Sequence, residues 1–237
     1  CRLVIDEMDK NSVIIEQIDE IIKSNYILLS KLMIKGELSQ IGDNDSGRLF
    51  YSAFDEDAPL KMNWLLEIIR NLFQKSEFNQ EEKKFTYEIK STIPSFDNFQ
   101  KVNHKKIKVF TKDYQSYCFK DFGIYIWRND DEYFSIRCGP IGQNGIGGHS
   151  HYDQLSIECF TDNSWILRDP GTGTYTDDIA TRNKFRSLDY HWGPKAKIQF
   201  PKEDEFDCFK LIYMGDGQVL QFDKSNCLGF AEFHGNR

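Results

Sequence analysis

Residues 122–138 read FGIYIWRNDDEYFSIRC, in which two short runs of β-branched and aromatic residues flank a polar turn. Such runs, bounded by Asn and Asp, are typical of neighbouring antiparallel strands. The same pattern of β-branched and aromatic residues continues on both sides. Further candidate strands lie at 84–90, 106–111, 153–160, 164–168, 196–200, 208–213, 218–222 and 228–233. The sequence therefore predicts an antiparallel β-sandwich over residues 79–237.

The residues before this region have a helical pattern. Apolar positions recur every three or four residues in 11–35, and 59–74 begins with Pro and continues as an amphipathic segment. The sequence thus predicts a multidomain α+β chain, with helices in 1–78 and the sandwich in 79–237. Because the chain starts at Cys1 and shows no leader pattern, we expect it to be a piece of a longer protein.

The composition excludes several classes of protein. The chain has 237 residues, 14% of them aromatic, and a net charge of −7. The aromatic content argues against a disordered chain, and the acidic balance argues against a nucleic-acid partner. The longest apolar runs are too short for a membrane-spanning helix. Six cysteines without a C-x-x-C pair are expected to be mostly free, buried thiols. Nothing indicates the oligomeric state.

A candidate metal site lies in the histidine-rich part of the chain. His149 and His151 are two residues apart, so an extended segment would place both on one face. Asp169 follows the strand expected at 164–168, and a hairpin with the preceding strand would return it to His151. His191 could complete the group. Two histidines, an aspartate and a water suit Zn²⁺, although ligand softness also permits other first-row metals.

Each of these residues also has an ordinary structural interpretation. The histidines could be surface or hydrogen-bonded groups, and Asp169 could simply start an Asp-Pro-Gly turn. A group of basic residues predicts either a positive patch that suits carboxylates and sulfates or a solvated loop face. Its members are Arg182, Lys184, Arg186, Lys195 and Lys197.

The order of these motifs resembles a known family. Residues 147–153 read GGHSHYD and 169–175 read DPGTGTY, and they are followed by Arg182, Phe185-Arg186 and His191. This arrangement is similar to the C-terminal part of the heparinase II/III-like polysaccharide lyases, over most of residues 120–195. The polar loop 42–48, GDNDSGR, also resembles the loop that closes the helical domain of that family.

The resemblance implies an architecture and an activity. Residues 1–78 would be the last helices of an incomplete (α/α) toroid, followed by the β-sandwich in 79–237. The activity would be β-elimination on a uronic-acid-containing polysaccharide, so the partner would be an anionic polysaccharide or oligosaccharide. The family also implies a bacterial protein that is periplasmic or secreted. Further catalytic residues would lie upstream on the toroid, so this chain alone would lack them.

The resemblance also implies roles for single residues. It makes His149 and Tyr175 catalytic, and it assigns a divalent metal, preferably Zn²⁺, to His151, Asp169 and His191. Substrate-side candidates are Arg182, Arg186 and Asn144. These roles agree with the chemistry, because charge that accumulates beside a carboxylate requires a cation or hydrogen-bond donor, and a neutral His or a deprotonated Tyr can act as base.

Two other classes of function remain open. A non-catalytic carbohydrate-binding or capsule-assembly module would keep the fold and the metal, and exposed rings such as Trp127 or Tyr190 would stack on sugars. A metal-dependent hydrolase of the metallo-β-lactamase kind would use H-x-H-x-D at 149–153, although Gln154 stands where the next His is usual.

Overall fold

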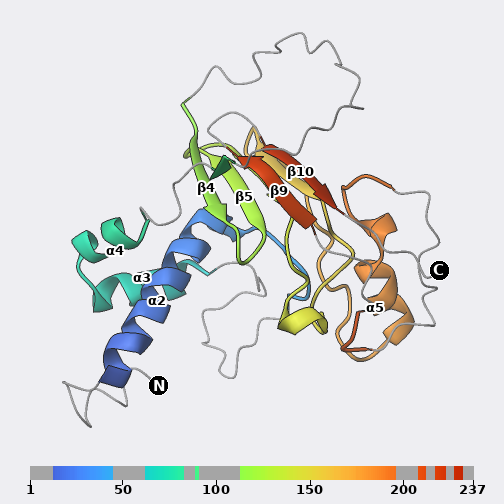
Figure 1. The fold of residues 1–237 in the computed structure, drawn as a ribbon, viewed down its shortest axis with the longest axis horizontal. Coiled ribbons are helices and arrows are strands. Elements are labelled where there is room, and N and C mark those ends of the chain that lie inside the picture. The colour runs from blue at the N-terminus through green and yellow to red at the C-terminus, as the bar shows by residue number, and fades with distance from the viewer. Residues whose placement is uncertain are drawn as a thin grey trace.

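The computed structural model of the protein describes residues 13–44, 62–82, 89–90, 113–195, 208–211, 217–222 and 227–231. The strands expected at 106–111 and 196–200 lie outside these ranges. In the described part, helices lie against one face of an antiparallel sheet, and a second, smaller sheet lies on the other face (Figure 1). The α+β class and a sandwich-like arrangement of antiparallel strands are thereby confirmed.

The helical part contains three helices in its described residues. They are α2 (Val13–Leu32), α3 (Asn63–Leu72) and α4 (Lys75–Glu82). The helix expected over 11–35 ends at Leu32, where two short strands form a hairpin, β1 (Met33–Ile34) and β2 (Glu37–Leu38). The helix expected over 59–74 ends earlier because Phe73 is extended, and α4 was not expected. The Gln74 backbone N–H donates to Glu77, 2.9 Å away, which helps α4 to begin there.

The larger sheet is a five-stranded antiparallel meander in the order β4-β5-β6-β7-β8. Its strands are β4 (Gln115–Phe119), β5 (Ile124–Arg128), β6 (Tyr133–Arg137), β7 (Ile157–Thr161) and β8 (Ser164–Leu167). The sequence pattern did not reveal β4 and placed the start of β7 at residue 153. The expected β7–β8 hairpin is confirmed, and its turn has φ values of 52° and 58° at Asp162 and Asn163.

The smaller sheet has the order β10-β9-β3, from β3 (Ile89–Lys90), β9 (Gly217–Phe222) and β10 (Cys227–Ala231). Phe222 packs on Tyr125 and Trp127 of β5, with ring centroids 5.2 Å and 4.9 Å away. Trp127 is therefore buried in the contact between the two sheets. This position is incompatible with stacking on a sugar at the surface.

The opposite face of the larger sheet shares one hydrophobic core with the helices. Ile124 and Ile126 alternate with the residues that face β9, and they belong to the same apolar cluster as Ile27 of α2 and Ile69 of α3. This core and α4 both cross the expected domain boundary at residue 78. That the helices form the end of an (α/α) toroid stays a prediction.

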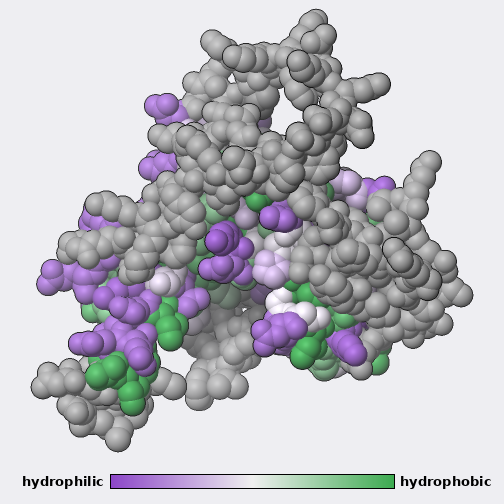
Figure 2. Space-filling view, viewed as in Figure 1, coloured by the Kyte–Doolittle hydropathy of each residue, from purple (hydrophilic) through white to green (hydrophobic). Residues whose placement is uncertain are grey.

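The surface of the helical part carries exposed apolar side chains. Figure 2 shows hydrophobic surface at the N-terminal end of α2, and the exposed apolar residues of this helix include Val13, Ile14 and Ile21. None of the helices in the described residues is long and apolar enough to cross a membrane.

Candidate metal and catalytic site

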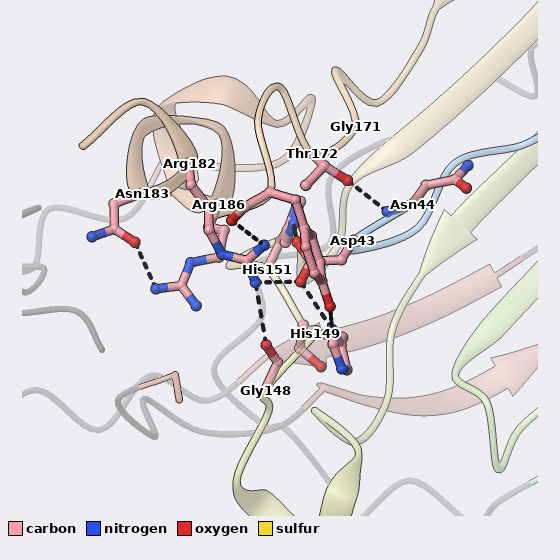
Figure 3. Close-up of polar contacts among 12 residues, drawn as sticks. Asp43, Asn44, Gly148, His149, His151, Gly171, Thr172, Arg182, Asn183 and Arg186 are labelled. Atoms are coloured by element: carbon pink, nitrogen blue, oxygen red, sulfur yellow. Dashed lines mark hydrogen bonds and ion pairs between the residues drawn. The ribbon is translucent and has the colours of Figure 1, made fainter. Parts of the chain in front are cut away.

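The site lies where loops from both halves of the chain meet (Figure 3). One loop follows β6 and carries His149 and His151, and a second follows β8 and carries Asp169. His191 comes directly after the 3₁₀ turn η3 (Leu188–Tyr190), and Asp43 comes from the segment after β2. The β7–β8 hairpin brings Asp169 back toward His151, as expected from the sequence.

Three buried side chains converge at the centre of the site. His151, Asp169 and His191 each offer one ligand atom, and these atoms lie within 4.8 Å of one another. The distance from His151 Nδ1 to His191 Nε2 is 3.3 Å, and that from His191 Nε2 to Asp169 Oδ2 is 3.1 Å. The expected proximity is therefore observed, whereas metal binding itself stays a prediction.

The hydrogen bonds behind the two imidazoles define their protonation. His191 Nδ1 lies 2.7 Å from the Ser187 carbonyl, which can only accept, so in the neutral ring Nδ1 carries the proton and Nε2 the lone pair. His151 Nε2 faces the Asp43 carboxylate at 3.1 Å, so in the neutral ring Nδ1 carries the lone pair. Two nitrogen lone pairs and an Asp169 oxygen thus point at one another. Positive charge stabilises such a group of acceptors, and either a proton or a metal ion could supply it.

A proton can supply that charge when no metal does. Burial alone would lower the pKa of His191, but the hydrogen bond and the charge of Asp169 outweigh it, so that the pKa is raised. Zn²⁺ would replace this proton in the same position. Two nitrogen ligands at about 2.0–2.1 Å from a tetrahedral ion lie about 3.4 Å apart, close to the spacing of these rings. The donor set and its outer hydrogen bonds therefore fit zinc.

Asp43 is the main site residue that the sequence did not reveal. Its buried carboxylate lies 3.1 Å from His151 Nε2 and 3.1 Å from His149 Nδ1, and it is ion-paired with Arg182. Burial would raise the pKa of Asp43, but the hydrogen bonds and charges of His151 and Arg182 lower it overall. The only signal for Asp43 in the sequence was its place in the polar loop 42–48, and the pattern of that loop assigns no chemical role to an aspartate there.

The backbone around Asp43 holds this carboxylate in place. The Asp43 N–H donates to the His149 carbonyl (2.9 Å), and the Asn44 N–H donates to Thr172 Oγ1 (2.6 Å). Gly42 has a φ of +63°, and a Cβ at this position would overlap the His149 carbonyl oxygen. A glycine is therefore required for the segment to approach the histidine loop so closely.

His149 is the accessible histidine of the site. Its side chain is 52% exposed, and the Tyr175 hydroxyl lies 3.4 Å from its Nδ1. The two rings are nearly parallel, with centroids 6.2 Å apart, and Phe209 packs edge-on against both. A cavity of about 160 Å³ borders His149 and is also lined by Phe122 and Pro140. The two expected catalytic residues thus form one pair that solvent can reach.

The expected substrate-side arginines are not placed at the surface. Arg182 and Arg186 are both fully buried. Arg182 donates to the carbonyls of Cys208 (3.0 Å) and Tyr175 (3.2 Å) as well as to Asp43. Arg186 donates to Cys208 (3.2 Å) and to Asn183 Oδ1 (2.7 Å). Because protein groups engage both guanidinium groups, this geometry suits holding the site together rather than direct contact with a polymer.

The remaining basic and polar candidates are also located. Asn144 is exposed in the 3₁₀ turn η2 (Gln143–Gly145), and its neighbour Gln143 accepts a hydrogen bond from the Gly148 N–H, 2.7 Å away. Lys195 donates to the His191 carbonyl at 3.1 Å. Arg182, Arg186 and Lys195 are therefore engaged within the protein, whereas Lys184 is exposed and Lys197 lies outside the described residues.

Two buried acids surround the cluster without being part of it. Asp153 Oδ2 lies 3.6 Å from Arg137 Nε, and Asp153 is not among the residues whose ligand atoms converge with those of His151. Glu158 accepts hydrogen bonds from the backbone N–H groups of Asp169 (3.2 Å) and Gln40 (3.3 Å). Burial raises the pKa of Glu158 to about 7.

Comparison with known proteins supports the family resemblance. Residues 111–191, about one third of the chain, match the family model described as Heparinase II/III-like, C-terminal. The resemblance inferred from the sequence is thus confirmed over this segment, which carries every expected metal and catalytic residue. That family is one of polysaccharide lyases. No curated protein and no solved structure matches the chain.

Proposed function

We propose that the protein is a polysaccharide lyase, or a fragment of one, that cleaves a uronic-acid-containing polysaccharide by β-elimination. One observation carries the proposal: an exposed His149–Tyr175 pair borders a buried cluster of His151, Asp169 and His191, inside the segment that matches the family. An anionic polymer as partner and a periplasmic or secreted location belong to the same proposal.

The pair can supply both proton transfers of the reaction. His149 Nε2 removes the proton at C5 of the uronate, and the C–H electron pair forms a C4–C5 double bond. The C4–O bond breaks, and the leaving oxygen takes its electron pair together with the proton of the Tyr175 hydroxyl. The products are an unsaturated uronate end and a new hydroxyl end. Solvent then restores the protonation states of both residues.

The buried cluster would hold the metal through His151 Nδ1, His191 Nε2 and Asp169 Oδ2. A bound Zn²⁺ would supply positive charge to the site, which would favour the negative charge that accumulates on the substrate. The protein residues around it fix the loop of His149, two positions from His151. Asn144, exposed on the turn before this loop, remains a candidate contact for the polymer.

To test the proposal, the full-length protein is incubated with a panel of polymers that includes alginate, heparan sulfate and chondroitin sulfate. The measurement is the ultraviolet absorbance of the new conjugated double bond. We expect absorbance on at least one polymer, with a loss of 100-fold or more for His149→Ala and for Tyr175→Phe (on the order of the factor that general acid–base catalysis contributes). Tyr26→Phe is the matched control, because it removes a hydroxyl from a half-buried tyrosine of α2 that packs on Phe78. A full-length protein that leaves the whole panel uncut would refute the proposal.

A non-catalytic carbohydrate-binding or capsule-assembly module is the second candidate. It is favoured by two exposed rings on either side of His191, since Tyr190 is 43% and Trp192 is 53% exposed. Exposed aromatic rings are suited to stacking on sugars. This candidate predicts that the polymer is retained without any unsaturated product, and that Trp192→Ala weakens the retention.

A further inference from the structure

Asp43 makes an unusual combination of contacts. One carboxylate meets two imidazoles that have different roles, since His151 belongs to the metal-type cluster and His149 to the exposed pair. Each oxygen serves one ring: Oδ1 faces His151 Nε2 and Oδ2 faces His149 Nδ1, both at 3.1 Å. Arg182 binds the same carboxylate from within the protein.

The contacts exclude one alternative for Asp43. A second cation between His149, His151 and Asp43 would have to lie beside the Arg182 guanidinium, which already neutralises the carboxylate. The second cation and the guanidinium group would be neighbours in a buried setting, where their positive charges repel each other strongly. The carboxylate is thus a hydrogen-bond acceptor for the three side chains, and each of them donates to it.

The consequence for the two histidines follows from these donor roles. A neutral imidazole has one N–H, so donation to Asp43 decides which nitrogen stays free. For His151 the free atom is Nδ1, which faces His191. For His149 the free atom is Nε2, because the charged carboxylate at 3.1 Å is a stronger partner for Nδ1 than the Tyr175 hydroxyl, which lies 3.4 Å from the same nitrogen. An unconstrained imidazole favours the proton on Nε2. His149 is therefore held in its less common tautomer.

We propose that Asp43 is a positioning residue that sets the tautomers of both histidines, leaving His149 Nε2 free as a base and His151 Nδ1 directed at the cluster. The catalytic consequence rests on the proposed function, whereas the tautomers do not. The Asp43 segment approaches from the helical half of the chain, with its own N–H bonded to the His149 carbonyl. That contact keeps the carboxylate and the histidine loop in register.

The first test reads the tautomers of the wild-type protein directly. Nitrogen NMR on side-chain-labelled histidine, at alkaline pH where imidazoles are neutral, distinguishes the Nδ1–H and Nε2–H forms. We expect Nδ1–H for His149 and Nε2–H for His151, and Asp43→Asn should shift His149 toward Nε2–H. Asp131→Asn is the control, because it changes an exposed, ion-paired carboxylate in another loop. His149 as Nε2–H in the wild type would overturn the proposal, even if no variant folds.

The second test uses zinc as the probe. Because groups that orient a metal-binding histidine typically matter by 10- to 100-fold, Asp43→Asn should weaken Zn²⁺ affinity by about that factor, and Asp131→Asn should not. Asp43→Glu, which keeps the carboxylate, should restore part of the loss. Unchanged zinc affinity in folded Asp43→Asn would contradict the role at His151.

The third test separates this inference from the proposed function. On any polymer that is cut, Asp43→Asn should lower kcat while KM changes little, because the variant alters the base rather than polymer binding. If the tautomers respond to Asp43→Asn but no polymer is cut by any form, the positioning role stands and the lyase proposal fails. If the histidines of Asp43→Asn keep the tautomers of the wild type and a polymer is still cut, the lyase proposal stands and the positioning role fails.

Discussion

His151 Nδ1 lies 3.3 Å from His191 Nε2, and the two rings meet at 67°. With Asp169 at the third position, this spacing leads to the first prediction. Purified protein should contain close to one zinc per chain by mass spectrometry, and His151→Ala and Asp169→Ala should each lose it. Asp153→Asn should retain zinc, because Asp153 contacts Arg137 instead of the cluster. If Asp153→Asn loses zinc while Asp169→Ala retains it, the hydrolase interpretation is favoured.

Removal of the metal should also lower the thermal stability. A ligand present at a thousand times its Kd stabilises the folded state by about 4 kcal/mol, which corresponds to a Tm shift of roughly 10 °C for a chain of this size. We expect a chelator to lower the Tm of the wild type by about this amount. The Tm of His151→Ala should not decrease further when the chelator is added. An equal decrease in Tm in the wild type and in His151→Ala would contradict the prediction of a metal site at His151.

The stability of the protein should depend on Glu158 as the pH changes. Burial raises the pKa of Glu158 from 4.5 to about 7, so between these values the folded protein binds more protons than the unfolded chain. The contribution of Glu158 to the free energy of unfolding should therefore fall as the pH rises, by on the order of 3 kcal/mol at most. Urea unfolding of metal-free protein should show that Glu158→Gln removes this part of the pH dependence. If the free energy of unfolding depends on pH in the same way in the wild type and in Glu158→Gln, the raised pKa of Glu158 is contradicted.

Gly42→Ala should damage the site through the backbone. The substitution combines a positive φ with an overlap between the new Cβ and the His149 carbonyl, and we expect a loss of about 1–3 kcal/mol of stability together with weaker zinc binding. Gly145→Ala is the matched control. Gly145 has a φ of +89°, but a methyl group added there would meet no atom within 4 Å, so the strain comes without the overlap. Equal effects on zinc binding at both positions would rule out the close approach as the cause.

The sequence was most informative where chemistry and local pattern coincide. The β7–β8 hairpin and the meeting of His151 with Asp169 followed from the two neighbouring strands expected at 153–160 and 164–168. Asp43 could not be predicted in the same way, because it lies 106 residues before His149 and reaches it through tertiary structure alone. The buried position of Arg182 was missed for a related reason, since its acceptors are mainly backbone carbonyls that no side-chain pattern reveals.

The approach of Asp43 from outside the family-matched segment limits how that segment can be used on its own. Residues 111–191 include Arg182, but the carboxylate that neutralises it belongs to the earlier half of the chain. Excised alone, the segment would either bury an uncompensated guanidinium or open to hydrate it, and both outcomes are costly. The matched segment is therefore not a portable module, and transfer of its chemistry to another scaffold would require residues 39–44 to be carried with it.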